Sequence, residues 1–404
     1  MKINQKLWNL LALADNSSFF SIYYTVRPLI SLKLLRFMHK AWAKNIDGFF
    51  SYPMWPLPEV PEAGNRVEWP ERKESAFLIT HDVDTRFGFE NIRVVCEVEK
   101  RLGFKGSWNI VPNLYRIDPP VMDYLRCSGM EIGVHDWNHD GKLFLKVKTF
   151  KERIRYINRT IREWGARGFR AGAVFHNDEW MQKLECEYDS SYYDTDPFQP
   201  LGGGCATIWP FFLGSLVELP YTMPQDHVLF VARMKLRVPV NKTFWLDSKE
   251  RKKNWLWMKE WCEKNAVEHN GKYWIIRGVD IWKMKAEWLI EKGGMILMLL
   301  HPEYLCQLEI REKNKKDREK AFLKRGWLPE DDEDVVMVRN EGVVEEIFQG
   351  TLLEQYAAFL HWFRQRYRKR VWHSLPGEVA CFYKRQTVFK PLNQQLQLFR
   401  PSSE

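Results

Sequence analysis

The sequence predicts an α/β fold built on a parallel sheet or barrel, and three observations indicate it. From Ala76 onward, short apolar runs of strand length alternate with longer amphipathic stretches of helix length. Glycines recur where a helix would return to the next strand, a place that favours a left-handed cap. The chain of 404 residues, 45% hydrophobic and 28% charged, has the composition of a globular protein with a large core.

The expected elements follow in order: strand 76–82, helix 88–102, strand 106–111, helix 119–128, strand 131–134, helix 148–164, strand 168–173 and helix 178–185. Further on, the pattern predicts strands 216–220, 228–231 and 295–300, and helices 276–292 and 352–367. In such folds catalytic groups gather at the carboxyl ends of the strands. Polar residues that follow the strands are therefore the candidates for a site.

Three segments are expected along the chain, and the middle one contains an insertion. Residues 1–70 stand outside the repeat and end in a proline-rich linker, which predicts a basic and apolar N-terminal appendage. Residues 71–385 form the predicted barrel, interrupted by a charge-dense insertion over 306–345. Residues 386–404 form a polar tail.

The net charge of +9 is concentrated at the two ends. Residues 1–50 hold seven Lys/Arg against two Asp/Glu, and residues 361–404 hold nine against two. A nucleic-acid binder would carry its basic patch on the folded body, so no nucleic-acid partner is expected. The basic ends fit peripheral contact with an anionic membrane surface or a phosphate-bearing substrate, and solvated charged helices are the plain alternative. Removing residues 1–50 is predicted to weaken binding to anionic vesicles.

The compartment follows from the cysteines and the N-terminus. Seven scattered cysteines without a CxxC pair indicate neither a disulfide framework nor a zinc ribbon. The apolar run 7–14 is short and Asp15 follows it, so no secretory signal is predicted. A cytoplasmic protein is expected, with the inner-membrane periphery as the alternative. The sequence indicates no oligomeric state.

Two motifs predict a metal site. Side chains alternate along a strand, so Asp82 and Asp84 share one face at the end of the first strand, while His81 points into the core. His135 and His139 are four residues apart, a spacing that places both imidazoles on one side of a helical turn. One aspartate and two histidines leave open positions on a divalent ion, as catalysis requires. The second carboxylate is then free to act as a base.

Each motif alone has a plainer interpretation. The aspartates could cap a helix that begins near Phe87, and the histidines could be exposed. Their occurrence together, each after a strand of the same repeat, favours the metal site. One divalent ion is expected, Zn²⁺ first, with Fe, Co and Mn as alternatives, because carboxylate and imidazole ligands suit all four.

Five segments in chain order resemble the motifs of the polysaccharide deacetylase family. This is the NodB homology, carbohydrate esterase family 4-like group, in particular its bacterial members with an HDVD first motif. The segments are Thr80–Asp84, Glu131–Gly141, Gly168–Gly172, the region of Tyr188–Ser191 and Glu218–Tyr221, and Leu299–Pro302. Gly172 stands where the family has proline. The resemblance implies a distorted (β/α)7-type barrel, the NodB/glycoside hydrolase-deacetylase barrel.

The resemblance also implies an activity, the metal-dependent removal of an acetyl group from an N-acetylated sugar of a bacterial surface polysaccharide or its precursor. With such a carbohydrate substrate, a lipid-linked glycan is a further expected partner of the basic ends. It implies a set of roles: Asp82 as base, Arg170 as its partner, Asp84, His135 and His139 as metal ligands, His301 as general acid, and Asp189 as the candidate that orients His301. Hydrolysis of another non-peptide C–N bond, in a cyclic amide or ureide, is the alternative. A catalytically silent glycan-binding barrel is a third interpretation.

Aromatic residues are the candidates for a carbohydrate wall, because their faces stack on sugar rings. Those expected to bind substrate are Trp137, between the two histidines, and Trp209, Phe211 and Tyr221 after the glycine-rich segment 202–204. His176, Asp226 and His227 are expected at most at the rim of the site.

Overall fold

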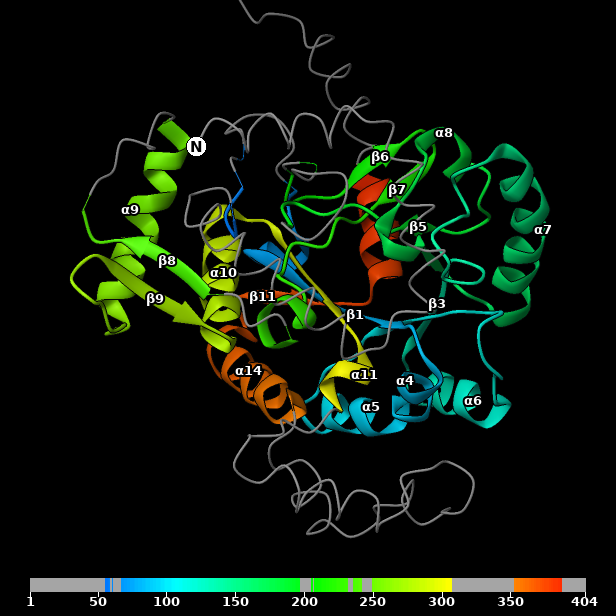
Figure 1. Ribbon diagram of the computed structural model, residues 1–404, viewed down its shortest axis with the longest axis horizontal. Helices are drawn as coiled ribbons and strands as arrows, with labels where there is room; N and C mark the ends of the chain where they lie inside the picture. The colour runs from blue at the N-terminus through cyan, green and yellow to red at the C-terminus, as the bar shows by residue number, and fades with distance from the viewer. Residues whose placement is uncertain are drawn as a thin grey trace, which may run out of the picture.

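A strongly curled, mostly parallel sheet forms the centre of the molecule (Figure 1). Its strands are β1 (Ser75–Val83), β2 (Ser107–Ile110), β3 (Glu131–His135), β4 (Gly168–Arg170), β5 (Tyr188–Asp189), β6 (Phe211–Leu213), β7 (Leu216–Glu218), β10 (Met295–Leu300) and β11 (Val371–His373). Their order is β10-β1-β2-β3-β4-β5-β7-β6, with β11 also paired to β1, and only the β6–β7 pair is antiparallel. The predicted α/β class is confirmed.

The computed structural model describes residues 55–58, 60, 67–196, 205, 207–231, 235–241, 249–306 and 352–386. Most of the predicted appendage 1–70, nearly all of the insertion 306–345 and nearly all of the tail 386–404 lie outside these residues. Within the described part, no helix is long and apolar enough to cross a lipid bilayer.

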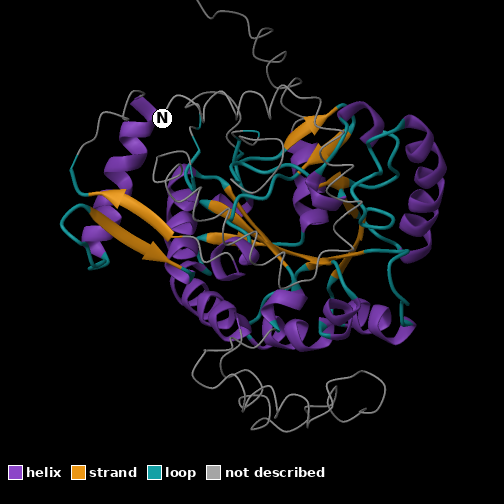
Figure 2. Cartoon of the chain, in the orientation of Figure 1, coloured by secondary structure: helices purple, strands orange, loops and turns teal. Residues whose placement is uncertain are grey.

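Helices lie outside the curled sheet (Figure 2). They include α4 (Arg86–Glu90), α5 (Ile92–Arg101), α6 (Pro119–Cys127), α7 (Val147–Trp164), α8 (Asp178–Met181), α9 (Lys249–Lys264), α10 (Val279–Lys292), α11 (Pro302–Leu305) and α14 (Leu352–Tyr367). The predicted helix 352–367 matches α14 at both ends. Its Phe363 stacks on Phe77 of β1 at 4.3 Å, which shows how an outer helix covers the sheet.

The barrel is completed by hydrogen bonds across the gap between β7 and β10. The backbone N–H groups of Thr222 and Met223 both donate to the carbonyl of Leu297 at 3.1 Å. The hydroxyl of Thr222 donates to the carbonyl of Met295 at 2.7 Å and accepts from the N–H of Leu297 at 3.0 Å. The segment after β7 therefore takes the place of a closing strand.

Two regions differ from the sequence prediction. The predicted strand 228–231 is wrong, because His227–Val231 is a helical turn in which the N–H groups of Val228 and Leu229 return to the carbonyl of Gln225. A short apolar run does not distinguish a strand from a turn of helix. The antiparallel pair β8 (Lys235–Pro239) and β9 (Tyr273–Arg277) was not predicted; with α9 it lies beside α10 at the left of Figure 1.

The face of β1 is as the alternation predicts. Asp82 and Thr80 both contact Arg170 inside the barrel. His81 points the other way, where its Nε2 lies 2.6 Å from Glu99 of α5 and its ring stacks on Trp108 at 4.0 Å. The buried carboxylates at the end of β1 are thereby directed to the carboxyl edge of the sheet.

Candidate metal centre

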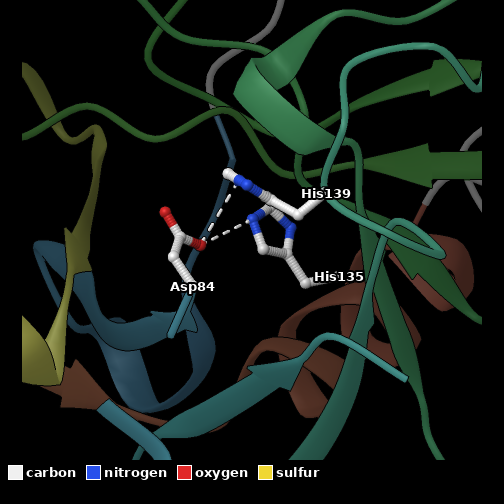
Figure 3. A group of neighbouring side chains, drawn as sticks. All are labelled: Asp84, His135 and His139. Carbon is white, nitrogen blue, oxygen red and sulfur yellow. Dashed lines mark ion pairs between the residues drawn. The ribbon is translucent and has the colours of Figure 1, made fainter. Parts of the chain in front are cut away.

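Asp84, His135 and His139 converge at the carboxyl edge of the sheet (Figure 3). Oδ1 of Asp84 lies 3.1 Å from Nε2 of His135 and 3.4 Å from Nε2 of His139. Two ligands bonded to one Zn²⁺ at about 2.0–2.1 Å lie about 3.0–3.4 Å apart, for angles between the octahedral and tetrahedral values. The spacing of the three ligand atoms therefore fits one small divalent ion.

The hydrogen-bonding state of these atoms fits an ion as well. Oδ1 of Asp84 is buried and accepts no hydrogen bond, although a buried carboxylate oxygen ordinarily has a partner. Nδ1 of His135 lies 3.0 Å from the carbonyl oxygen of Arg170, so this nitrogen carries the proton and Nε2 is left as the ligand atom. The three residues together could hold a metal ion.

The charges in the group are mutually stabilising. Burial alone would raise the pKa of Asp84, but His139 and His135 hold that pKa well below its ordinary value. Burial would likewise lower the pKa of His135, whereas Asp82 and Asp84 raise it to about 9. Without an ion, the carboxylate is thus negative and His135 favours a second proton on Nε2; a bound cation would take the place of that proton, and carboxylate is the form that binds metal.

The two histidines do not share a helical turn, and that expectation is wrong. His135 ends β3, and His139 lies in the following loop, where Asp136 (φ 54°) and His139 (φ 51°) have left-handed backbone. Such conformations are unfavourable for residues with a Cβ and persist only where the surroundings hold them. Here Arg153 of α7 binds both oxygens of Asp140, at 2.6 and 2.7 Å. The imidazole rings still lie 4.7 Å apart.

Asp82 lies beside Asp84, His135 and His139, which we call the metal group, and only one of its two carboxylate oxygens accepts hydrogen bonds. Its Oδ1 accepts from Nη1 of Arg170 at 2.8 Å and from Nδ2 of Asn109 at 2.9 Å, and its Oδ2 faces His135 Nε2 at 3.7 Å. Burial would raise the pKa of Asp82, but Arg170 and His135 lower it overall. Asp82 is therefore an ionised carboxylate with one oxygen directed at the site.

His301 follows β10 and is held by Asp226, not by Asp189. Nδ1 of His301 lies 2.7 Å from Oδ1 of Asp226, and the backbone N–H of His301 donates to Oδ2 at 2.7 Å. Nε2 of His301 is 4.0 Å from Oδ2 of Asp84. Burial would lower the pKa of His301, but Asp226 and Asp84 raise it to about 10. His301 therefore favours the protonated form, and its Nε2 lies close to the metal group.

Asp189 has a different place from the one expected. It ends β5, where its carboxylate accepts from the N–H of Ser191 at 2.8 Å and from the Ser191 hydroxyl at 2.9 Å. It pairs in register with Glu218 of β7. Burial, then the charge of Asp189, raises the pKa of Glu218 well above its ordinary value. Asp189 therefore belongs to a buried pair of acids in the sheet and does not orient His301.

The four aromatic residues expected to bind substrate are separated. Trp137 is half-buried beside the ligand loop. Phe211 lies on β6 and packs edge-on against Tyr192 at 5.3 Å. Tyr221 is buried and its hydroxyl donates to Asp196 at 2.8 Å, so it does not present a face to a ligand. Trp209 is buried at the amino end of β10, where its indole donates to the carbonyl of Gly293 at 2.8 Å, away from the site.

A second group of potential ligands lies beside the first. Asp226, His227 and His301 have ligand atoms within 4.8 Å of one another. However, Oδ1 of Asp226 accepts from the N–H of His227 at 2.8 Å and is paired with His301, and Oδ2 accepts from the His301 N–H. These hydrogen bonds already satisfy the carboxylate, so this group fits an ion less well than the first.

Two residues of the site were not found from the sequence. Asp226 was expected only at the rim, and Asn109 was not considered, although it is a lone amide in a buried strand and that is a usable signal. A Cβ at Gly133 would lie 2.1 Å from Oδ1 of Asn109, so this glycine makes room for it. Gly172 has the same explanation, because a Cβ there would lie 2.5 Å from Oδ2 of Asp136.

Comparisons with known proteins give similarity in structure alone. No protein-family model matches the sequence, and no curated protein matches it. A protein from Mycobacterium smegmatis assigned as a polysaccharide deacetylase is 13% identical with a TM-score of 0.47, over 80% of this chain and 95% of its own.

Two further structures are similar at the same low level of identity. One, from Bordetella bronchiseptica and assigned as a polysaccharide deacetylase involved in O-antigen biosynthesis, is 15% identical with a TM-score of 0.38, over 72% and 93% of the two chains. An allantoinase is 11% identical with a TM-score of 0.43, over 79% and 93%.

Proposed function

We propose that this protein is a metal-dependent hydrolase that removes an acetyl group from an N-acetylated sugar of a bacterial surface polysaccharide or its precursor. The observation that supports this function most is the group of three ligand atoms on Asp84, His135 and His139. The carboxylate of Asp82 and the imidazole of His301 lie on either side of it, and their surroundings favour the ionised and the protonated form. A base and an acid on either side of a metal are what hydrolysis of an amide requires.

Asp84, His135 and His139 would hold the ion, which when bound polarises a carbonyl and lowers the pKa of water towards about 7. Asp82 acts as the base through Oδ2, the oxygen that Arg170 and Asn109 leave unbonded. It takes a proton from the water that attacks the acyl carbon. Arg170 keeps the Asp82 carboxylate ionised, so the base is available at neutral pH.

His301 acts as the acid through Nε2. Asp226 fixes the ring by bonding Nδ1 and stabilises the imidazolium, so the proton to be transferred is directed at the site. An amine leaves poorly unless it is protonated, and His301 would supply that proton as the C–N bond breaks. This step matters most for an N-acyl substrate.

Metal analysis together with acetate release tests the proposal. The purified full chain is assayed on a panel of N-acetylated monosaccharides and oligosaccharides, before and after chelation and after readdition of Zn²⁺, Fe²⁺, Co²⁺ or Mn²⁺. We expect about one ion per chain, and acetate release that chelation abolishes and one of these ions restores. Acetate release that survives complete removal of metal would contradict it. Ring opening of a cyclic ureide without acetate release would favour hydrolysis of another C–N bond.

A further inference from the structure

The exposed side of α7 carries a group of unpaired cations. Lys148, Lys151, Arg155 and Arg159 are all exposed, and none of them forms an ion pair with a described residue. Glu152 and Glu163 are the exposed acidic residues of the helix. Cations without acidic partners on one side of a helix create a positive potential that favours an anionic ligand.

An aromatic pair connects these cations to the metal group. The rings of Trp137 and Tyr156 stack with centroids 5.3 Å apart and an angle of 22° between their planes. Tyr156 is 38% exposed, an unusual exposure for so large a side chain. The guanidinium of Arg155 lies 4.9 Å from the centre of the Tyr156 ring, and its Nη2 donates to the Tyr156 hydroxyl at 3.3 Å. The guanidinium and the two rings are thus in contact in series, and their exposed parts form one surface.

This surface is fixed relative to the metal ligands. Trp137 lies midway between His135 and His139 in the chain, and its N–H donates to Oδ1 of Asp136 at 2.6 Å. Its carbonyl accepts from the N–H of Asn113 at 3.1 Å. Arg153, on the same helix as Tyr156, binds Asp140 beside His139 through two hydrogen bonds. The helix and the loop that carries His139 are therefore joined by these hydrogen bonds.

We propose that Trp137, Tyr156, Arg155 and Arg159 form an outer subsite for an acidic sugar unit, a uronate, of the oligosaccharide whose N-acetyl group reaches the metal group. This inference rests on the proposed function and names its substrate class. Aromatic rings stack on the apolar face of a sugar. A guanidinium presents two parallel N–H groups that match the two oxygens of a carboxylate. A neutral glycan would use the rings but not the cations.

The experiment compares two probes with the full chain by calorimetry at low salt and 10 °C. The acidic probe is a tetrasaccharide of alternating N-acetylglucosamine and glucuronate, and the neutral probe is chitotetraose. The test variant is R155Q/R159Q. The matched control is K252Q/K264Q, which removes two exposed, unpaired cations from α9, at the opposite side of the molecule in Figure 1.

The wild type is expected to bind the acidic probe about tenfold more tightly than the neutral one, the effect of two charge pairs of about 0.7 kcal/mol each. R155Q/R159Q loses this preference and binds chitotetraose as before, and K252Q/K264Q behaves as the wild type. Tyr156→Ala weakens binding of both probes by several-fold, because stacking serves both. Equal affinity of the wild type for the two probes, or an equal loss in the control, would overturn the subsite.

Two further measurements separate the alternatives. Acetate is assayed in the cell after each titration, so a preference for the acidic probe without acetate release supports the subsite and contradicts only the proposed function. Sedimentation with phosphatidylglycerol vesicles tests a membrane role. If R155Q/R159Q loses vesicle binding while its affinity for both sugars is unchanged, this side of α7 faces a membrane and the subsite is wrong.

Discussion

Two histidine–carboxylate groups lie side by side at the carboxyl edge of the sheet, and they differ in what their polar atoms already bind. In the group of Asp84, His135 and His139, the carboxylate oxygen that faces both imidazoles accepts no hydrogen bond. In the group of Asp226 and His301, both carboxylate oxygens are bonded. The same side chains therefore make an open group that suits a metal ion and a closed pair that suits proton transfer.

A third histidine–carboxylate pair, His81 and Glu99, is also hydrogen-bonded but lies outside the site. His81 and Glu99 lie 2.6 Å apart with both side chains fully buried on the helix side of β1, and Tyr356 donates to the same carboxylate at 2.7 Å. This pair faces away from the site, so its role is to join β1, α5 and α14. The three groups contain the same types of side chain, so their position relative to the carboxyl edge of the sheet decides whether they serve the site or the packing of the core.

The largest expected effect is on the open group. Asp84→Asn removes the negative charge between the imidazoles, so the protein should lose its metal and acetate release should fall by a factor on the order of 10³ or more. Metal per chain and initial rates measure this. Asp280→Asn on the surface of α10 is the matched control and should change neither. An Asp84→Asn protein with a full complement of metal would contradict the ligand assignment.

A change in the closed pair, Asp226 and His301, should lower the rate of catalysis without removing the metal. His301→Gln is expected to keep its metal and to lose about 10²- to 10⁴-fold in the rate of acetate release from an amide. An aryl acetate, whose leaving group needs no proton, should lose much less. His361→Gln, at an exposed position of α14, serves as the control. Loss of metal in the His301 variant would instead place this imidazole among the ligands.

A smaller effect is expected where α7 supports the open group. Arg153→Gln breaks the double hydrogen bond to Asp140, so the loop that carries His139 should loosen and metal affinity should fall about 10- to 100-fold. Competition with a chelator of known affinity measures the change. Arg162→Gln, also on α7, is the control: it removes the exposed ion-pair partner of Glu185 and should leave the metal affinity unchanged. Equal affinities in the two variants would show that this support is unnecessary.

The buried pair behind β1 should affect stability alone. Glu99→Ala leaves His81 and Tyr356 without their shared partner and is expected to lower the free energy of unfolding by about 3 kcal/mol. Urea unfolding measures this free energy, with Glu97→Ala, a half-buried carboxylate on the same helix, as the control that is expected to lower it by about 1 kcal/mol or less. Metal affinity should be unaffected. A change in that affinity would mean that this pair is coupled through β1 to the site.

The sequence predicted the parts of the site that lie in short motifs. Alternation along β1 placed Asp82 and Asp84 together, and the βα repeat placed Arg170 and His301 at the same edge. It could not show that Asp226 holds His301, because 75 residues separate them and only the closure of the barrel brings them together. The left-handed backbone at His139 was also hidden, since a four-residue spacing favours a helix until tertiary contacts override it.

The substrate wall was predicted least well. Aromatic residues serve cores and ligands alike, and composition does not distinguish the two. Trp209 and Tyr221 proved to be buried with their polar atoms bonded inside the protein. Tyr156, which stacks on Trp137, was overlooked because it lies on a helix whose periodicity gave no reason to select it.

Anomalous X-ray diffraction from crystals grown with zinc tests the central claim most directly, because it distinguishes the open group from the closed pair. The structure predicts one strong peak at about 2.0–2.3 Å from the carboxylate of Asp84 and the Nε2 atoms of His135 and His139. A peak on Asp226, His227 and His301 instead, or no peak in a protein that still releases acetate, would contradict it.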